Sequence, residues 1–193
     1  MIDKLERWDK ALFKFLNGVH NDLFDFLMPW ISNKWVWLPL YALLLYLLYR
    51  HKKGHIALTL LSIAALIFIS DQLASGILKP WVARLRPCYD PELADSVHLL
   101  KGCGGRYGFA SSHASNSFAI AFFCWMLLRD HVKYIWLLIP WAILVAYSRV
   151  YLGVHFPGDI IVGALIGIAA AYIMVAVKRK ALSVQQITRN KKD

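Results

Sequence analysis

Long runs of apolar residues, separated by short polar stretches, are the feature that most constrains how this chain can fold. The runs at 56–78, 111–128, 134–150 and 160–177 each approach the roughly 20 residues that cross a hydrocarbon core. A shorter run, 35–49, either has its ends at the membrane interface or extends toward Met28. Hydrophobic residues make up 59% of the chain, more than a soluble domain can cover with polar surface. We therefore predict one all-α domain, an integral membrane helical bundle of about five transmembrane helices.

The first 34 residues have a different pattern. Leu5, Trp8, Leu12 and Leu16 recur at helical spacing among charged residues. This pattern is typical of an amphipathic helix lying in the membrane interface, and a helix packed on the side of the bundle is the alternative. An uninterrupted apolar core of the kind found in signal peptides is missing, so cleavage is not expected. The chain is expected to divide into an N-terminal amphipathic interfacial segment (1–34), a transmembrane domain (35–177) and a basic cytoplasmic tail (178–193).

The formal net charge of +10 is concentrated in the loop after the first apolar run, the loop after the third, and the tail. Positive loops face the cytoplasm, so the loop 79–110 and the turn 151–158 are predicted on the opposite side. For a bacterial inner membrane that side is the periplasm. A basic soluble protein would suggest nucleic acid, but cations placed between membrane runs indicate topology and an anionic ligand instead.

The polar residues on this outer side form three clusters: Lys79, Arg84, Arg86 and Pro87; Ser111, Ser112 and His113; and Ser148, Arg149, His155 and Asp159. Charged groups so close to hydrocarbon are costly and need partners or a function. Lys79, Arg86 and Arg149 have few nearby anions, and such cations bind tetrahedral oxyanions well. Backbone N–H groups of Ser111 and Ser112, at the start of a helix, are expected to be free for an anion. Phosphate is the predicted ligand.

His155 and Asp159 suggest how such a phosphate would react. The Asp159 carboxylate, one helical turn away, can accept the Nδ1 proton of His155 and leave Nε2 free as a nucleophile. His113 can then protonate the leaving oxygen as a general acid. Attack would form a phosphohistidine, which water would hydrolyse, and neither a metal nor a cofactor is expected.

The same three clusters, in this order and spacing, resemble the signature of the type 2 phosphatidic acid phosphatase superfamily. The resemblance covers residues 56–177. It implies phosphate binding by Lys79, Arg86, Arg149, Ser111 and the Ser112 backbone, with His113 as acid, His155 as nucleophile and Asp159 as its orienting group. The family's middle motif usually reads Pro-Ser-Gly-His, whereas Ala110 and Ser112 replace Pro and Gly here. We expect a modified pocket rather than an inactive one.

This family includes lipid phosphate phosphatases, undecaprenyl diphosphate phosphatases, lipid A phosphatases and soluble vanadium haloperoxidases. Undecaprenyl diphosphate or a lipid A-type phosphate is the favoured substrate here, because the site faces outward. Phosphatidylglycerol phosphate and phosphatidate stay open. The expected partners are the lipid phosphate and membrane lipids, without nucleic acid. A rival from another class is a transporter whose cationic vestibule binds anions without turnover.

Several other residues carry minor predictions. For Arg84, surface positioning is favoured and a catalytic role is the alternative. Asp71, inside an apolar run, is expected to be a structural hydrogen-bond partner. Cys88 and Cys103 share the outer loop, where an oxidising compartment permits a disulfide. The histidines outside the motifs are expected at the interface or in solvent: His20, His51, His55, His98 and His131.

Gly163 and Gly167 form a GxxxG pair in the last apolar run. Small residues at this spacing let two helices approach closely. We expect a helix contact inside the bundle, and a homodimer interface is the alternative.

Overall fold

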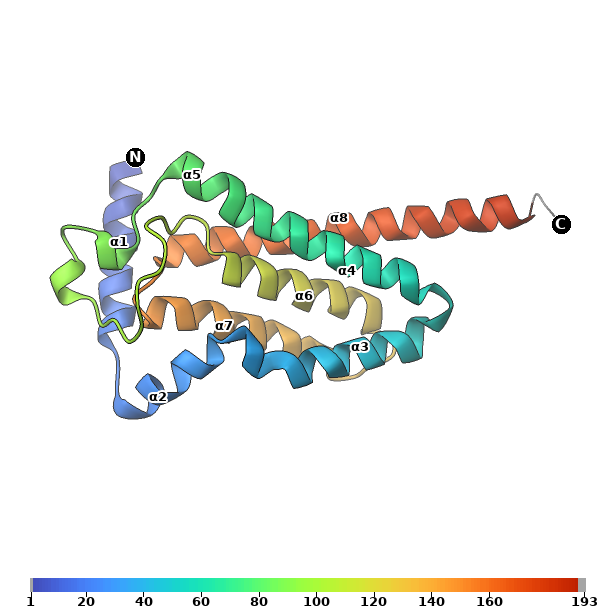
Figure 1. Cartoon of the computed structure of the whole chain (residues 1–193), viewed down its shortest axis with the longest axis horizontal. Helices are drawn as coiled ribbons and strands as arrows, with labels where there is room; N and C mark the ends of the chain where they lie inside the picture. Colours follow the sequence, from blue (N-terminus) through green and yellow to red (C-terminus); the bar gives the residue numbers. More distant parts are fainter. Residues whose placement is uncertain (1, 191–193) are drawn as a thin grey trace.

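The computed structural model describes residues 2–190, which form helices joined by loops, with an isolated β-bridge between Leu85 and Tyr107. The long helices run side by side along the longest axis of the molecule (Figure 1). They are α3 (Leu38–Lys52), α4 (Ile56–Asp71), α6 (Ser112–Leu128), α7 (Leu138–Tyr151) and α8 (Pro157–Asn190). The prediction of an all-α fold is confirmed.

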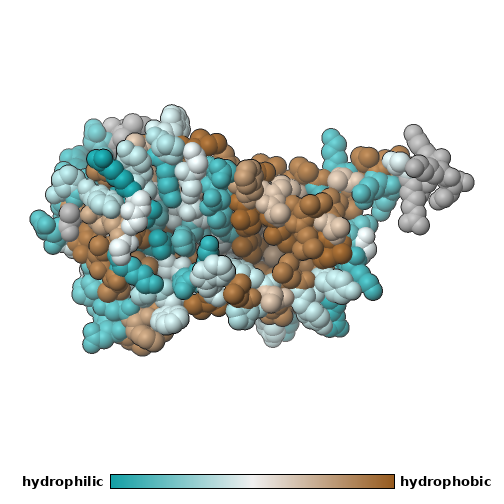
Figure 2. Space-filling view, in the orientation of Figure 1, coloured by the Kyte–Doolittle hydropathy of each residue, from teal (hydrophilic) through white to brown (hydrophobic). Residues whose placement is uncertain are grey.

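Two helical stretches, Lys34–Val82 and Pro157–Thr188, are long and apolar enough to cross a membrane, and Ile135–Tyr151 is a shorter apolar helix. The first stretch folds back on itself between α3 and α4 (Figure 1). Hydrophobic residues cover much of the visible bundle surface, whereas hydrophilic residues gather at the end that carries α1 and the long loop (Figure 2). This distribution is compatible with the expected bundle, and the number of membrane crossings stays a prediction.

Helix α6 lies at the centre of the bundle because its buried positions are mostly small. These positions include Ala114, Ser115, Ser117, Ala119 and Ala121. Gly163 and Gly167 of α8 face this helix, and a Cβ at either would collide with the carbonyl oxygen of Ser111 or Ser115. The glycine pair therefore serves close helix packing inside the chain, as expected.

Helix α4 does not continue as a regular α-helix to the end of its apolar run. Residues 72–78 form a π-helical turn, followed by the short helix α5 (Lys79–Val82). Ala83 then adopts a left-handed conformation with φ of +50°. Wide turns of this kind rotate the side chains that follow them and are frequent at functional sites. The turn thereby sets the direction of Lys79.

The N-terminal segment forms two helices, α1 (Ile2–Gly18) and α2 (Asp22–Ile31), where the sequence pattern predicted one. Asn21 explains the division, because its side chain accepts a hydrogen bond from Phe24 N at 3.0 Å and caps α2. Helix α1 crosses the end of the bundle (Figure 1). Phe13 is buried on the bundle, whereas Leu5 and Trp8 stay exposed. The burial of Phe13 agrees with packing on the bundle, and the position in the membrane interface stays a prediction.

The last helix is longer than its apolar run. It begins at Pro157, whose fixed φ suits the first turn of a helix. It also continues to Asn190 through much of the basic segment that was expected to be a separate tail. Residues beyond 177 include good helix formers and neither glycine nor proline, so the chain has no reason to end the helix there.

Candidate active site

Backbone hydrogen bonds join the beginning and the end of the long loop between α5 and α6. Gly108 N donates to Arg84 O at 2.9 Å, and Arg86 N donates to Arg106 O at 3.2 Å. Cys88 and Cys103 are joined by a disulfide, as expected, with their Cα atoms 6.2 Å apart. These links fix the backbone on both sides of Arg86.

His155 and Asp159 meet as the sequence predicts. Asp159 is fully buried and His155 is 1% exposed. The Nδ1 atom of His155 lies 3.3 Å from Asp159 Oδ2, which also accepts the Phe156 N–H at 3.0 Å. Burial lowers the pKa of His155 to about 4, although Asp159 acts in the opposite direction; Arg86 and Arg149 lower it further. The imidazole is therefore neutral at neutral pH, with Nε2 not engaged by Asp159.

Arg84 belongs to this cluster and is not the surface-positioning residue that was expected. Its Nη1 donates to Asp159 Oδ1 at 3.0 Å, and its guanidinium lies 4.1 Å from the centre of the Phe156 ring. The contact between Arg84 and Asp159 could not be predicted from the sequence, because the two residues are 75 positions apart. The contact depends on how the loop folds back.

Gly108 is a further residue of the site, and the sequence motifs did not predict it. A Cβ at this position would lie 2.9 Å from Asp159 Oδ2, 3.3 Å from Arg86 Cγ and 3.6 Å from His155 Nδ1. Only glycine lets the loop backbone approach the buried pair so closely. A glycine two residues before the Ala110-Ser111 pair was the available hint.

The three predicted phosphate-binding cations converge on the same end of the bundle. The charges of Arg86 and Arg149 both act on Lys79, which also donates to Ser75 Oγ at 3.3 Å. Arg86 is 8% exposed, and its Nε donates to Tyr107 O at 3.2 Å. Burial lowers the pKa of Arg86 below its ordinary value, an effect that Asp159 opposes. Neighbouring buried cations repel one another, so an anion between them would stabilise this arrangement.

Arg149 has unmet hydrogen-bonding capacity. Its Nη1 donates to Ser32 Oγ, but its buried Nε has no partner among the described residues. Ser111 Oγ is likewise buried and unpartnered within residues 2–190. Buried polar groups are normally hydrogen-bonded. A bound tetrahedral anion would supply acceptors for both side chains.

One detail of the Ser111–Ser112 prediction is wrong. The Ser111 N–H donates to the Asp159 carbonyl oxygen at 3.0 Å, so it is not free to bind an anion. Helix α6 begins one residue later, at Ser112, and the first N–H groups of a helix have no intrahelical partner. The imidazole of His113 lies in this first turn, where the charges of Lys79, Arg86 and Arg149 act on it. All three sequence motifs therefore meet.

A cavity of about 660 Å³ opens beside His113. Its lining mixes polar side chains, among them Ser112, Asp71 and Asn116, with aromatic and aliphatic ones such as Trp37 and Phe68. Asn116 Nδ2 donates to Asp71 Oδ1 at 3.2 Å, which agrees with the structural role predicted for Asp71. This mixed lining suits an amphiphile whose polar end reaches His113.

Potential metal ligands gather elsewhere. Among the described residues, His20, Asp25 and His98 bring one ligand atom each within 4.8 Å of one another. The His20 and His98 rings are stacked and parallel, with an interplanar angle of 1°. Parallel stacked rings direct their in-plane lone pairs along parallel planes, so they do not converge on one ion. His98 instead forms a hydrogen bond with Asp25 at 2.8 Å, so it is not freely solvated, and a position at the membrane interface stays a prediction.

Comparison with known proteins gives a consistent result. The PAP2 superfamily profile matches residues 56–183. A lipid A 4'-phosphatase from Bacteroides thetaiotaomicron is 40% identical over 86% of this chain and 75% of its own length. An undecaprenyl-diphosphatase from Sulfolobus acidocaldarius is 32% identical over 86% of this chain and 77% of its own.

Solved structures are similar in fold. The crystal structure of Aquifex aeolicus LpxE aligns with a TM-score of 0.60 and 27% identity, over 86% of this chain and 93% of that one. A transmembrane PAP2-type phosphatidylglycerolphosphate phosphatase from Bacillus subtilis aligns with a TM-score of 0.66 and 26% identity. That alignment covers 92% of this chain and 87% of the other.

Proposed function

Because the chain belongs to the PAP2 superfamily, we propose that it hydrolyses a lipid phosphate by attack of His155 on phosphorus. Relatives with three kinds of lipid phosphate in their names support lipid phosphatase activity at this general level. The observation that carries the mechanism is the buried His155–Asp159 pair, with His155 Nδ1 3.3 Å from Asp159 Oδ2. This contact orients the imidazole and leaves Nε2 for the substrate.

The reaction proceeds in two displacements. In the first, the neutral Nε2 attacks phosphorus while Nδ1–H donates to Asp159, and His113 protonates the departing lipid oxygen. In the second, His113 accepts a proton from water, which attacks the phosphohistidine and releases inorganic phosphate. Lys79, Arg86 and Arg149 hold the non-reacting oxygens and stabilise the charge in the transition state. These residues supply every proton transfer, so the proposed mechanism is metal-independent.

A lipid A-type monophosphate is the favoured substrate. Two relatives, 40% and 37% identical to this chain, are named lipid A 4'-phosphatase. The cavity beside His113 is lined by both hydrogen-bonding and apolar side chains. A phosphorylated sugar with acyl chains likewise combines polar and apolar parts. Undecaprenyl diphosphate and phosphatidylglycerol phosphate are the alternatives, and a substrate panel separates them.

The test uses the purified full chain in detergent, with inorganic phosphate release measured on lipid A, undecaprenyl diphosphate and phosphatidylglycerol phosphate. We expect the fastest release from lipid A. His155→Ala should lower kcat/KM by at least about 10³-fold, since removing the nucleophile of a covalent mechanism has effects of this size or larger. His131→Ala, on an exposed histidine at the other end of the bundle, is the matched control.

Rapid acid-free quenching with ³²P-labelled substrate should trap label on wild type and none on His155→Ala. Equal turnover by both proteins would contradict the mechanism. Absence of release from wild type across the panel would favour the anion transporter, which flux measurements in liposomes would then detect.

We further propose that the site faces the periplasm from the inner membrane, as the distribution of cations indicates. Arg106 and Arg129 are exposed at opposite ends of the bundle. Cys88 and Cys103 are paired and Cys124 is buried, so native cysteines should give little background. A membrane-impermeant maleimide should label Arg106→Cys in spheroplasts and leave Arg129→Cys unlabelled. The reverse pattern would invert the orientation.

A further inference from the structure

The N-terminal helix reaches the proposed nucleophile through one side chain. Asp9, on α1, uses both carboxylate oxygens. Its Oδ1 accepts the Gly158 N–H at 2.8 Å, and its Oδ2 lies 2.8 Å from Arg84 Nη1. Gly158 is the second residue of α8, the helix that carries Asp159. The contact therefore joins two elements nearly 150 residues apart in sequence.

Arg84 continues this chain of contacts into the site. The same Nη1 that pairs with Asp9 also lies 3.0 Å from Asp159 Oδ1. Asp159 thus divides its two oxygens: Oδ1 binds Arg84, and Oδ2 faces His155 and the Phe156 N–H. The contact with Arg84 at Oδ1 restricts rotation of the Asp159 carboxylate. A carboxylate held in this manner presents Oδ2 to the imidazole in one orientation.

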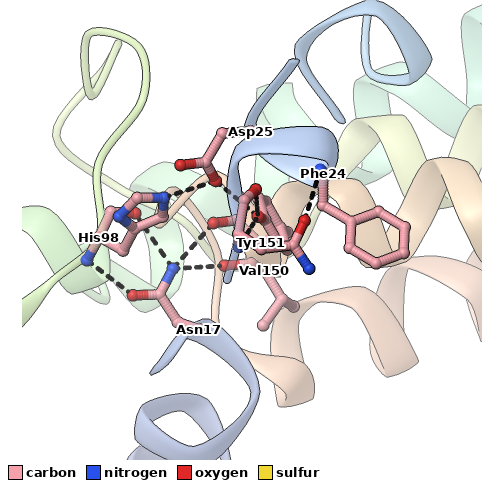
Figure 3. A network of polar contacts seen from close by, with 7 residues as sticks. Asn17, Phe24, Asp25, His98, Val150 and Tyr151 are labelled. Carbon is pink, nitrogen blue, oxygen red and sulfur yellow. Dashed lines mark hydrogen bonds and ion pairs between the residues drawn. The ribbon is translucent and has the colours of Figure 1, made fainter. Parts of the chain in front are cut away.

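The far end of the N-terminal segment is anchored beside another part of the site. The Asn17 side-chain amide donates to the carbonyl oxygens of Val150 and Tyr151, at 3.2 and 2.8 Å (Figure 3). Tyr151 Oη donates in turn to Asp25 of α2 at 2.5 Å. Val150 and Tyr151 directly follow Arg149 in the sequence. The segment is thus attached on both sides of the turn that carries His155.

We propose that Asp9 and Arg84 are positioning residues for the His155–Asp159 pair, so that α1 completes the active site. This inference rests on the proposed function of His155. Arg84 acts through Asp159, and Asp9 acts by holding Arg84 between two carboxylates and away from solvent. The side chain of Arg84 is only 20% exposed and that of Asp9 15%, so both charges depend on each other for pairing.

A double-mutant cycle tests the proposal. Steady-state kinetics and thermal unfolding are measured on the detergent-purified full chain carrying Arg84→Gln, Asp9→Asn, or both. We expect kcat to fall about 10- to 100-fold in Arg84→Gln, because misplacing a reacting group by about 1 Å has effects of this order. KM should change less than about twofold, since the phosphate-binding cations are untouched.

Asp9→Asn should give a smaller loss, and adding it to Arg84→Gln should produce little further change, because the two residues act in series. Arg84→Lys should recover part of kcat. Asp3→Asn, an exposed acidic residue on the same helix, is the control and should match wild type.

The outcomes separate this inference from the proposed function. Wild-type kcat in Arg84→Gln, together with an inactive His155→Ala, would overturn the positioning role and leave the nucleophile intact. Additive losses in the cycle that track a lowered unfolding temperature would also overturn it, since they indicate structural support alone. Activity in His155→Ala would instead reject the proposed function itself.

Discussion

The two ends of the helical bundle carry similar polar residues in opposite surroundings. At the end with α1 and the long loop, His155 and Asp159 are buried and joined to Arg84. At the other end, Arg129 lies 3.9 Å from Asp130, with side chains 51% and 83% exposed. Surface ion pairs of this kind contribute little to stability because water and salt screen them.

This difference shows that residue type alone does not identify a site in a membrane protein. Cations at the exposed end fit the role of topology signals, which need only charge. Cations at the buried end carry a desolvation cost, and Arg149 still has an unpartnered Nε among the described residues. A buried cation whose desolvation is not offset by a partner within the protein indicates a bound anion. The comparison therefore predicts large functional effects at one end and small effects at the other.

After loss of the proposed nucleophile, the largest expected effect separates two arginines. Arg149→Ala should lower kcat/KM for lipid phosphate by about 10²- to 10³-fold, the usual cost of losing one group that stabilises transition-state charge. Arg129→Ala, on an exposed arginine at the opposite end, should change it less than about twofold. Phosphate release by the purified proteins measures both. Equal losses from the two substitutions would remove the functional contrast between the ends.

A smaller effect is expected at Gly108, and Gly105 in the same loop provides the control. Gly108→Ala places a methyl group 2.9 Å from Asp159 Oδ2, so the loop or the carboxylate must shift. We expect kcat to fall about 10-fold, since the displacement is a fraction of the 1 Å that lowers rates about 10²-fold. Gly105→Ala meets no atom within 4 Å and should behave like wild type. Unchanged turnover in Gly108→Ala would mean that the loop backbone does not constrain the pair.

Features set by local sequence were easier to predict than contacts between distant segments. The apolar runs predicted the long helices because a helix that crosses a bilayer must be both long and hydrophobic. His155 and Asp159 were paired correctly because four residues at a helix start span one turn. The contacts of Asp9, Arg84 and Gly108 with the site were not predicted, since they join segments far apart in sequence. Such contacts follow from how α1 and the long loop pack on the bundle end.

The helix boundaries of the structure differ from those predicted where local hydrogen bonding or helix propensity outweighed the hydrophobic pattern. Asn21 divides the N-terminal segment by capping α2, a signal that a hydrophobic pattern does not contain. The basic segment after residue 177 continues α8 because charge does not end a helix. The free N–H expected of Ser111 is bonded to Asp159 O, because α6 starts one residue later than the apolar run suggested.

The disulfide at the buried end of the bundle is expected to affect stability rather than activity. Cys88→Ser with Cys103→Ser should lower the free energy of unfolding by about 3 kcal/mol, the loop-entropy estimate for a 15-residue loop. Reducing agent should lower the unfolding temperature of wild type and leave that of the double variant unchanged. Turnover at 25 °C should stay within about threefold, since Arg86 keeps its backbone bonds to the loop. A wild-type unfolding temperature in the double variant would show that the bridge is not formed in solution.

The smallest expected effect concerns the protonation of His155. Its pKa of about 4 in the folded protein lies below the ordinary 6.5 because burial disfavours the charged ring. The unfolded chain therefore binds more protons between these values, so the stability from a neutral His155 is complete above pH 6.5 and decreases as pH falls toward 4. Nitrogen-15 NMR of histidine-labelled protein, with His155→Asn to assign the signal, should find this ring neutral at pH 5.5. Titration of His155 near 6.5 would mean that the ring is hydrated, and the contrast between a buried and an exposed end would then fail at its central residue.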